Sequence, residues 1–556
     1  MYQQVFDPVT DSLAFSSLFA ALPLITLFVL LGGLRWPAQW AGLTALGVAV
    51  LVAVIVYSMP VGQAVDAAAL GAVFGFFPIM WIVVNAIWIY NLTVKTGHFA
   101  VLRRSFQTIS NDQRIQAIII AFCFGGLIEA LAGFGTPVAI SSVMLIALGF
   151  KPIKAATVAL VANTAPVAFG AIAVPIITLA EVTGLPKDEL GTMVGRQTPF
   201  LALLVPLLLV YLVDGRRGVR QVWPAAVVGG VAFALGQFLC SNYISVELTD
   251  IVASLLGAGA IVLLLRVWSP SEPLLVEPPA LGSRPAIAGA AEATDRGFED
   301  MIKRRDDSHK DTRREIFEAY APYLIIIAVF AIAQLGFVKD ALANGVEEFA
   351  WPGLDISKPD GEAVDTVFKF NWLPAGGTLL LVSGLLTMAL LRVNAGRALR
   401  TYAETFDQLK WAILTVMAVL ALAFVMNLSG QTITLGLWLA GAGGFFAILA
   451  SIIGWLGVAV TGSDTSSNSL FGALQVAAAR DAGLSPTLMA AANSSGGVLG
   501  KMISPQNLAI CAAAVGMVGK EGEIFRKVVG WSLGLLLVMC ALVYLQSTAL
   551  LSWMVP

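Results

Sequence analysis

The chain has 556 residues, a mean hydropathy of +0.84, 58% hydrophobic residues and only 12% charged residues. Soluble proteins carry about 25% charged residues, so this composition excludes an ordinary soluble fold and indicates a polytopic membrane protein. The formal net charge of −2 argues against a nucleic-acid partner. We therefore expect a lipid bilayer to be the main environment of the chain.

Apolar runs of helix-spanning length recur from one end of the chain to the other. The first, from Leu13 to Leu34, follows two aspartates and no basic residue, which argues for a retained span and against a cleaved signal peptide. The sequence predicts an all-α protein with about 12 transmembrane helices. These are expected near 13–34, 40–59, 69–91, 155–181, 198–213, 222–239, 250–268, 321–338, 372–391, 411–427, 486–516 and 528–551.

Two further apolar stretches, 115–150 and 445–480, are interrupted in the middle. If both are re-entrant hairpins and the N-terminus is outside, most of the 33 basic residues fall inside and the acidic segment 339–371 falls outside. A single crossing by 115–150 would reverse this distribution for the following connections. The positive-inside rule therefore favours re-entrant hairpins, with both termini outside.

A charged connector divides the chain. Residues 269–320 are rich in proline and alanine and then strongly charged, which is typical of a solvated linker. We expect it on the cytoplasmic side. The two halves are residues 1–268, with the first hairpin (115–150) and a broken helix (155–181), and residues 321–556, with the second hairpin (445–480) and a broken helix (486–516).

The two halves resemble each other at their interruptions. AGFGTP at 132–137 aligns with TGSDTS at 461–466, and VANTAPVAFGAIAVP at 161–175 aligns with AANSSGGVLGKMISP at 491–505. The predicted hairpins enter from opposite sides, so the repeat is inverted. Inverted repeats with broken helices are typical of secondary transporters, whose substrate site lies near the bilayer midplane.

The interruptions supply polar groups to an otherwise apolar body. Backbone freed at a break must face protein or a water-filled cavity, and a helix that starts there presents N–H groups that attract an anion. Hydroxyl and amide side chains nearby suit a small hydroxylated anion, although helix packing is an alternative role for them. The expected substrate-binding residues are Gly133, Gly135, Thr136, Asn163, Thr164, Ser463, Thr465, Ser466, Asn493, Ser494, Ser495 and Lys501.

Three ionisable residues lie within apolar segments. Glu129 precedes the first interruption, Asp464 lies in the second, and Lys501 follows the second Asn-hydroxyl pair. Intramembrane ionisable residues are functional candidates, and a carboxyl in a dry pocket can exchange a proton near neutral pH. We expect Glu129 or Asp464 to couple transport to protons. The alternative is a structural ion pair of either carboxylate with Lys501.

Soluble-type chemistry has no support in the sequence. The chain has two histidines, four widely separated cysteines, and no HExxH, CxxC, GxGxxG or P-loop pattern. We therefore expect neither an enzyme nor a metal site, and no cofactor beyond a coupling ion, H⁺.

Long motifs resemble one family. GLIEALAGFGTPVAI, GWLGVAVTGSDTSSNSLFGALQ and GGVLGKMISPQNLAICAAAVGMVGKE are similar to the bacterial L-lactate permeases, and the resemblance extends over nearly the whole chain. It implies import of L-lactate, D-lactate and glycolate by proton symport across the inner membrane. It also implies an elevator-type transporter, in which the hairpins and broken helices move against a scaffold that in some members makes a homodimer. A sodium-coupled carboxylate transporter of the same architecture remains open, because unwound carbonyls near Gly133 and Gly462 could hold sodium.

Overall fold

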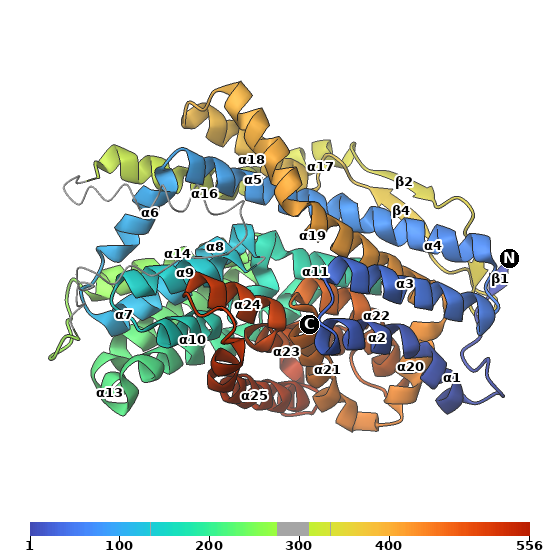
Figure 1. The fold of residues 1–556 in the computed structure, drawn as a ribbon. Coiled ribbons are helices and arrows are strands. Elements are labelled where there is room, and N and C mark those ends of the chain that lie inside the picture. The colour runs from blue at the N-terminus through green and yellow to red at the C-terminus, as the bar shows by residue number, and fades with distance from the viewer. Residues whose placement is uncertain (134, 275–310, 334) are drawn as a thin grey trace.

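The computed structural model describes residues 1–133, 135–274, 311–333 and 335–556. Helices dominate this part of the chain, and many of them run along one common direction (Figure 1). The connector expected at 269–320 lies largely outside the described residues. Its end is helical and not a loop, because helix α16 (Arg313–Ala333) already begins there.

The N-terminal apolar runs form helices. Prolines mark two of the starts, since Pro37 and Pro60 directly precede α3 and α4, where the first N–H groups have no intrahelical acceptor. The elements are β1 (Tyr2–Gln3), α1 (Leu13–Ala20), α2 (Leu22–Phe28), η1 (Val29–Gly33), α3 (Ala38–Ile55), α4 (Val61–Phe74), η2 (Gly75–Met80), α5 (Trp81–Lys95) and α6 (His98–Gln107).

The first interrupted stretch and its successors follow. Asp112 caps the first of these helices, because its side chain accepts from the backbone N–H of Arg114. The elements are α7 (Gln113–Ala117), η3 (Ile118–Phe124), α8 (Gly125–Ala132), α9 (Thr136–Ala147), α10 (Pro152–Ala162), η4 (Val167–Phe169), α11 (Gly170–Thr183), α12 (Lys187–Val194), α13 (Thr198–Tyr243) and α14 (Thr249–Leu264).

In the second half, as in the first, two helices on either side of an interruption are followed by a helix that is itself broken. Ser463, Ser485 and Ser504 each cap the helix that follows, with Oγ accepting a backbone N–H. The elements after α16 are α17 (Gly336–Ala343), β2 (Glu347–Ala350), β3 (Ile356–Ser357), β4 (Val367–Phe370), α18 (Gly376–Leu390), α19 (Ala395–Ser429), α20 (Gln431–Ala440), η5 (Gly443–Phe445), α21 (Phe446–Thr461), α22 (Asp464–Asp481), α23 (Pro486–Gly500), η6 (Lys501–Ile503), α24 (Pro505–Ala514), α25 (Glu521–Gln546) and η7 (Ser552–Met554).

Among the described residues, nine helices are long and apolar enough to cross a bilayer, or ten when the bent pair α10 and α11 counts as one span. This multi-pass character agrees with the composition. The count differs from the twelve spans predicted, for identifiable reasons. Helix α13 continues through a kink at Asp214 and Gly215 and so joins two predicted spans, while α14 and α18 have only 16 and 15 residues.

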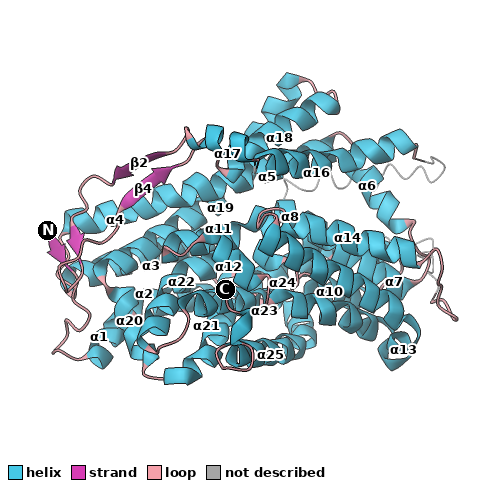
Figure 2. Ribbon diagram, turned by 180° about the vertical axis from the view of Figure 1, so that it is seen from behind, coloured by secondary structure: helices cyan, strands magenta, loops and turns pink. Residues whose placement is uncertain are grey.

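The prediction of an all-α protein is wrong at one end of the molecule. Strand β1 pairs in parallel with β3, and β2 pairs antiparallel with β4 (Figure 2). These short strands lie in the acidic segment 339–371 and at the N-terminus, where charged residues exclude the chain from an apolar helix. Alternation of aromatic and polar residues in Val367–Phe370 was the available sign of a strand.

Two large hydrophobic cores and a small cluster of Trp88, Leu92 and Ala398 underlie the helices. The smaller core joins α1 to α4 with parts of α19, α20 and α22. The larger core joins the two interrupted stretches, both broken helices and α25. The polar residues singled out in the sequence therefore lie mainly with the larger core.

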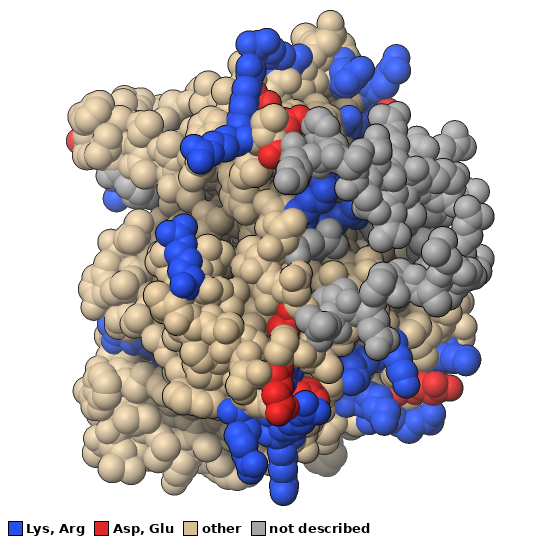
Figure 3. Space-filling view, turned by 90° about the vertical axis from the view of Figure 1, so that its left-hand side faces the viewer, with Lys and Arg blue, Asp and Glu red and all other residues tan. Residues whose placement is uncertain are grey.

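Contacts between connections agree with the predicted sidedness. The N-terminal amine pairs with Asp355 at 3.1 Å, and both segments are predicted outside. Lys187 pairs with Glu247 at 2.5 Å, again between two connections predicted outside. Lysines and arginines gather on the opposite end of the molecule, where α6, α7 and the kink of α13 lie (Figure 3). The absolute orientation stays a prediction from charge.

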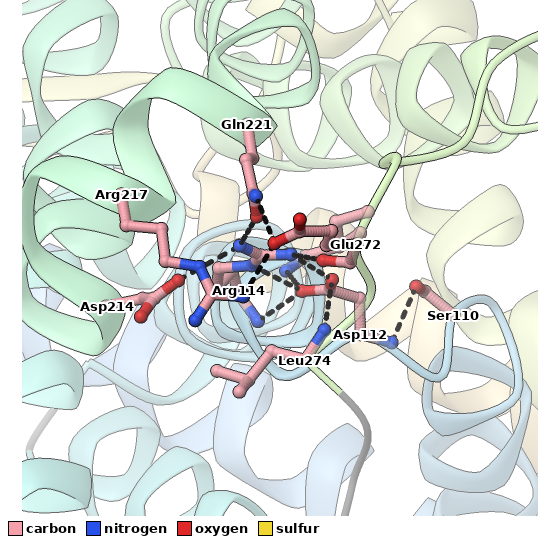
Figure 4. A network of polar contacts seen from close by, with 9 residues as sticks. Ser110, Asp112, Arg114, Asp214, Arg217, Gln221, Glu272 and Leu274 are labelled. Carbon is pink, nitrogen blue, oxygen red and sulfur yellow. Dashed lines mark hydrogen bonds and ion pairs between the residues drawn. The ribbon is translucent and has the colours of Figure 1, made fainter.

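A buried arginine fastens the base of the first hairpin (Figure 4). Arg114 is 1% exposed and donates to Asp112 at 2.7 Å, to Asp214 at 3.0 Å and to Gln221 at 2.6 Å. It also donates to the backbone carbonyl of Glu272 at 2.7 Å. One side chain thus ties α7 to the kink of α13 and to the segment after α14.

Replacing Arg114 with leucine should destabilise the protein strongly. Asp112 would be left as a buried carboxylate without its cation, and breaking such a pair costs about 3–5 kcal/mol. The thermal-unfolding midpoint of the purified protein in detergent measures the loss. The matched control is Arg217→Gln, because the Arg217–Glu272 pair is exposed to solvent and contributes little to stability. Equal midpoints for the two variants would contradict the assigned role of Arg114.

Candidate functional site

A cavity of about 950 Å³ lies where the two interrupted stretches meet. On one side it is lined by both interruptions, by the start of α11 and by the first turn of α24. On the other side it is lined by the turn between η1 and α3 and by part of α19. A volume in this range suits a small-molecule site and exceeds what one small anion needs.

A left-handed glycine forms each interruption. Gly135 has φ +82° directly before α9, and Gly462 has φ +77° between α21 and α22. Only glycine adopts this backbone region without strain, so these residues allow each chain to reverse direction. We call the segments around Gly135 and Gly462 the first and second tips.

The arms on either side of each tip run antiparallel. Ser141 Oγ in α9 donates to the Ile120 carbonyl at 3.4 Å, across the first tip. Ser467 Oγ in α22 donates to the Gly454 carbonyl at 3.1 Å, across the second tip. Each interrupted stretch is therefore a helical hairpin in shape, while its re-entrant placement in the bilayer stays a prediction.

Gly133 differs in backbone conformation from the two tip glycines. Its backbone is right-handed, so it does not supply the unusual angle. A Cβ at Gly133 or at Gly170 would instead lie 2.8 Å from Glu129 Oε1. Both glycines therefore make room for a buried carboxylate.

The first broken helix bends sharply where predicted. Helices α10 and α11 meet at 64°, and Asn163 and Thr164 lie at the break. In the second half the break falls later, at η6, which begins at Lys501. Asn493, Ser494 and Ser495 were expected at the break. They lie instead inside helix α23.

Glu129 is held by partners from three elements. Its carboxylate is 2% exposed and accepts from Lys501 Nζ at 2.7 Å and from Asn163 Nδ2 at 2.8 Å. Lys501 also donates to the Gly133 carbonyl at 3.1 Å. The ion pair with Lys501 that was expected as an alternative is therefore present at Glu129.

Asp464 has a different environment. It is 3% exposed, accepts from Ser494 Oγ at 2.6 Å, and lies 3.4 Å from Asn468 Nδ2. Its Oδ1 has no hydrogen-bond partner among the described residues, and no described cation forms an ion pair with it. Gly497 makes room for this oxygen, since a Cβ there would lie 2.4 Å from it. The two buried carboxyls of the site thus differ in their counter-charge.

The predicted residues divide into two groups. One group lines the cavity and consists of Glu129, Gly133, Gly135, Ser463, Asp464, Thr465, Ser466 and Lys501. The other group does not line it and consists of Thr136, Asn163, Thr164, Asn493, Ser494 and Ser495. Asn163 and Ser494 still reach the site indirectly, because they hold Glu129 and Asp464.

Helix α24 lies within the broken helix predicted at 486–516, but sequence reasoning named none of its residues for the site. A Cβ at Gly135 would lie 2.5 Å from Ile510 Cδ1, and a Cβ at Gly462 would lie 2.5 Å from Gln506 Oε1. Both tips therefore pack against the same short helix, with Asn507 donating to the Gly462 carbonyl at 3.3 Å. The sequence SPQN after the second break, a serine cap followed by proline, was the available sign of this helix start.

Comparison with known proteins identifies the family. The family model described as L-lactate permease matches residues 16–550. The chain belongs to the L-lactate permease family. An L-lactate permease of Bacillus subtilis (strain 168) is 40% identical, with 100% of both chains covered. The glycolate permease GlcA of Escherichia coli (strain K12) is 42% identical over 96% of this chain and 95% of its own.

A solved structure of Neisseria gonorrhoeae MtrF, described as illuminating a class of antimetabolite efflux pumps, covers 86% of this chain and 83% of its own. It does so at 15% identity and a TM-score of 0.45, which is too low to support an inference. The curated relatives are permeases, which confirms that this L-lactate permease family member is a transporter and not an enzyme. The described residues contain no cluster of histidine, cysteine or acidic side chains able to hold a metal.

The pair of Lys501 and Glu129 can be tested by a double-mutant cycle. Lys501→Met should lower the free energy of unfolding by about 3–5 kcal/mol, because it strands a buried carboxylate. Adding Glu129→Gln to Lys501→Met should recover most of the loss, since no buried charge then remains. Thermal unfolding of the three variants in detergent measures the coupling. A double variant no more stable than Lys501→Met would show that the pair does not hold the two halves together.

Proposed function

We propose that this protein imports L-lactate, D-lactate and glycolate together with protons across the bacterial inner membrane. The observation that carries the proposal is the buried Asp464, which has an unpartnered oxygen and lines the same cavity as both tips. The names of the L-lactate and glycolate permeases among its relatives support the substrate class.

The cavity suits a small carboxylate. Helices α22 and α24 both begin at it, and first-turn N–H groups together with the positive end of a helix attract an anion. Ser463, Thr465 and Ser466 add hydroxyls from the second tip. Lys501 contributes less charge than the sequence suggests, because Glu129 already neutralises it.

Opposing effects act on the Asp464 proton. Burial without a paired cation favours the neutral acid, since an isolated buried charge is costly. The start of α22 and the Ser494 hydroxyl favour the carboxylate. A group balanced in this way can take a proton when an anion arrives beside it and release the proton afterwards. We therefore assign proton coupling to Asp464 and a structural role to Glu129.

Elevator movement and an inverted repeat complete the proposal. The cavity lies between the hairpin elements and two other segments, 31–39 and 411–416, which would belong to a fixed scaffold. By the charge rule, the connections nearest these segments face the cytoplasm, so the cavity opens inward in this conformation. The two sequence halves, 1–268 and 321–556, would each contribute one hairpin and one broken helix to the moving domain. A scaffold of this kind is also where a homodimer would form.

Sodium coupling is less well supported. The carbonyls that could hold sodium are those near Gly133 and Gly462. Lys501 already donates to the Gly133 carbonyl at 3.1 Å, and Asn507 donates to the Gly462 carbonyl at 3.3 Å. A sodium ion would have to share each carbonyl with a donor that is already bound, and at Gly133 this donor is positively charged.

Uptake into proteoliposomes tests the proposed function. An inward proton gradient should drive accumulation of labelled L-lactate, while a sodium gradient alone should not. One proton per monocarboxylate carries no net charge, so imposing a membrane potential should change uptake little; each uncompensated charge would contribute about 2.3 kcal/mol per 100 mV. Uptake into liposomes without protein measures the passive entry of undissociated lactic acid. Accumulation driven by sodium at constant pH would overturn the coupling assignment.

A further inference from the structure

A side-chain amide beside the second tip has no hydrogen-bond partner among the described residues. Gln506 lies in the first turn of α24, is exposed to the cavity, and packs against the left-handed Gly462 of the second tip. No described residue forms a hydrogen bond with its side chain. Its oxygen and nitrogen are therefore both free for a ligand, unlike most polar groups around it.

The other amides of the site are already committed. Asn163 donates to Glu129, Asn507 donates to Ser504 and to the Gly462 carbonyl, and Asn493 donates to Asn468. Asn163 and Asn493 also do not line the cavity. The remaining lining amide, Gln39, also has no hydrogen-bond partner among the described residues, but it belongs to α3 on the opposite wall. Gln506 is thus the uncommitted amide next to the second tip.

The chemistry of an amide matches that of a hydroxyl. A primary amide donates through its NH₂ and accepts through its oxygen, and an alcohol does both as well. In a 2-hydroxy acid the hydroxyl is on the carbon next to the carboxylate. In the first turn of α24, Pro505 has no N–H and the Asn507 N–H donates to Ser504 Oγ, so a carboxylate there would lie next to the Gln506 N–H. This position brings the 2-hydroxyl within reach of the Gln506 side chain.

We propose that Gln506 is a specificity-determining residue that recognises the 2-hydroxyl group of the substrate. This inference rests on the proposed function and deepens it, because it names the group that separates 2-hydroxy acids from plain monocarboxylates. Since Gln506 touches Gly462, hydroxyl recognition also involves the second tip, whose next residues include Asp464.

The expected size follows from one hydrogen bond to a cavity-facing group. Such a bond contributes a net amount that corresponds to about 3- to 10-fold in affinity. The loss should appear for lactate and glycolate and not for propionate, which has the same carbon chain as lactate without the hydroxyl. A purely structural role for Gln506 would weaken all three substrates alike.

Competition in proteoliposomes tests the inference. Unlabelled lactate or propionate competes with the uptake of labelled L-lactate, and each competition curve gives an apparent affinity. The ratio of lactate affinity to propionate affinity is then compared between wild type and Gln506→Met. The ratio should fall about 3- to 10-fold in the variant, with propionate affinity unchanged. Gln39→Met, which removes the cavity-lining amide on the other wall, is the matched control and should keep the wild-type ratio.

Three outcomes would overturn the inference: an unchanged ratio in Gln506→Met, an equal fall in Gln39→Met, or a wild-type protein that does not prefer lactate to propionate. If Gln506→Met does not accumulate in membranes, Gln506→Asn withdraws the amide by one methylene and should lower the same ratio. Failure of the proposed function is distinguishable, because the wild-type protein would then take up no labelled lactate in a proton gradient.

Discussion

The ion pair between Lys501 and Glu129 is the contact on which the site depends. It joins the first hairpin to the second broken helix, 372 positions apart in the chain. Neither charge could remain buried alone, because an unpaired ion in an apolar interior costs several kcal/mol. Each half therefore requires the other, and Gly133 and Gly170 are small because they border the carboxylate that makes this contact. The polar pocket is a consequence of the pairing.

The pairing also separates the roles of two similar residues. Glu129 and Asp464 are both buried acids that line one cavity, yet among the described residues a cation contacts Glu129 and none contacts Asp464. A carboxylate fixed by a lysine and an amide is poorly suited to lose and regain a proton. Asp464 has hydroxyl and amide donors on one oxygen and no partner on the other, so a change in its surroundings can shift its charge. This difference is the basis on which we propose proton coupling by Asp464 and structural support by Glu129.

Much of this architecture was predictable because bilayer physics restricts what a sequence can do. Glycine and polar residues inside apolar runs had to mark interruptions, and the tips at Gly135 and Gly462 lie where AGFGTP and TGSDTS predict them. The charges of the loops predicted which connections share one side of the membrane. Ion pairs such as Lys187–Glu247 join connections that are predicted on the same side.

Other features depend on contacts that are distant in sequence. Asn493 shares its sequence register with Asn163, but the second half breaks at Lys501, so the two amides have different surroundings. Nothing local reveals that α24 receives both tips, because Gln506 and Ile510 meet them only through folding. Nor could the sequence choose which carboxylate Lys501 would pair with.

The central claim is that binding of the anion is linked to a proton on Asp464. Proton uptake on addition of L-lactate to the purified protein, measured with a pH indicator in weakly buffered detergent solution, tests this most directly. The account predicts uptake of about one proton per bound lactate near neutral pH, lost in Asp464→Asn and retained in Glu129→Gln. Lactate binding without proton uptake by the wild-type protein, or equal uptake by Asp464→Asn, would contradict it.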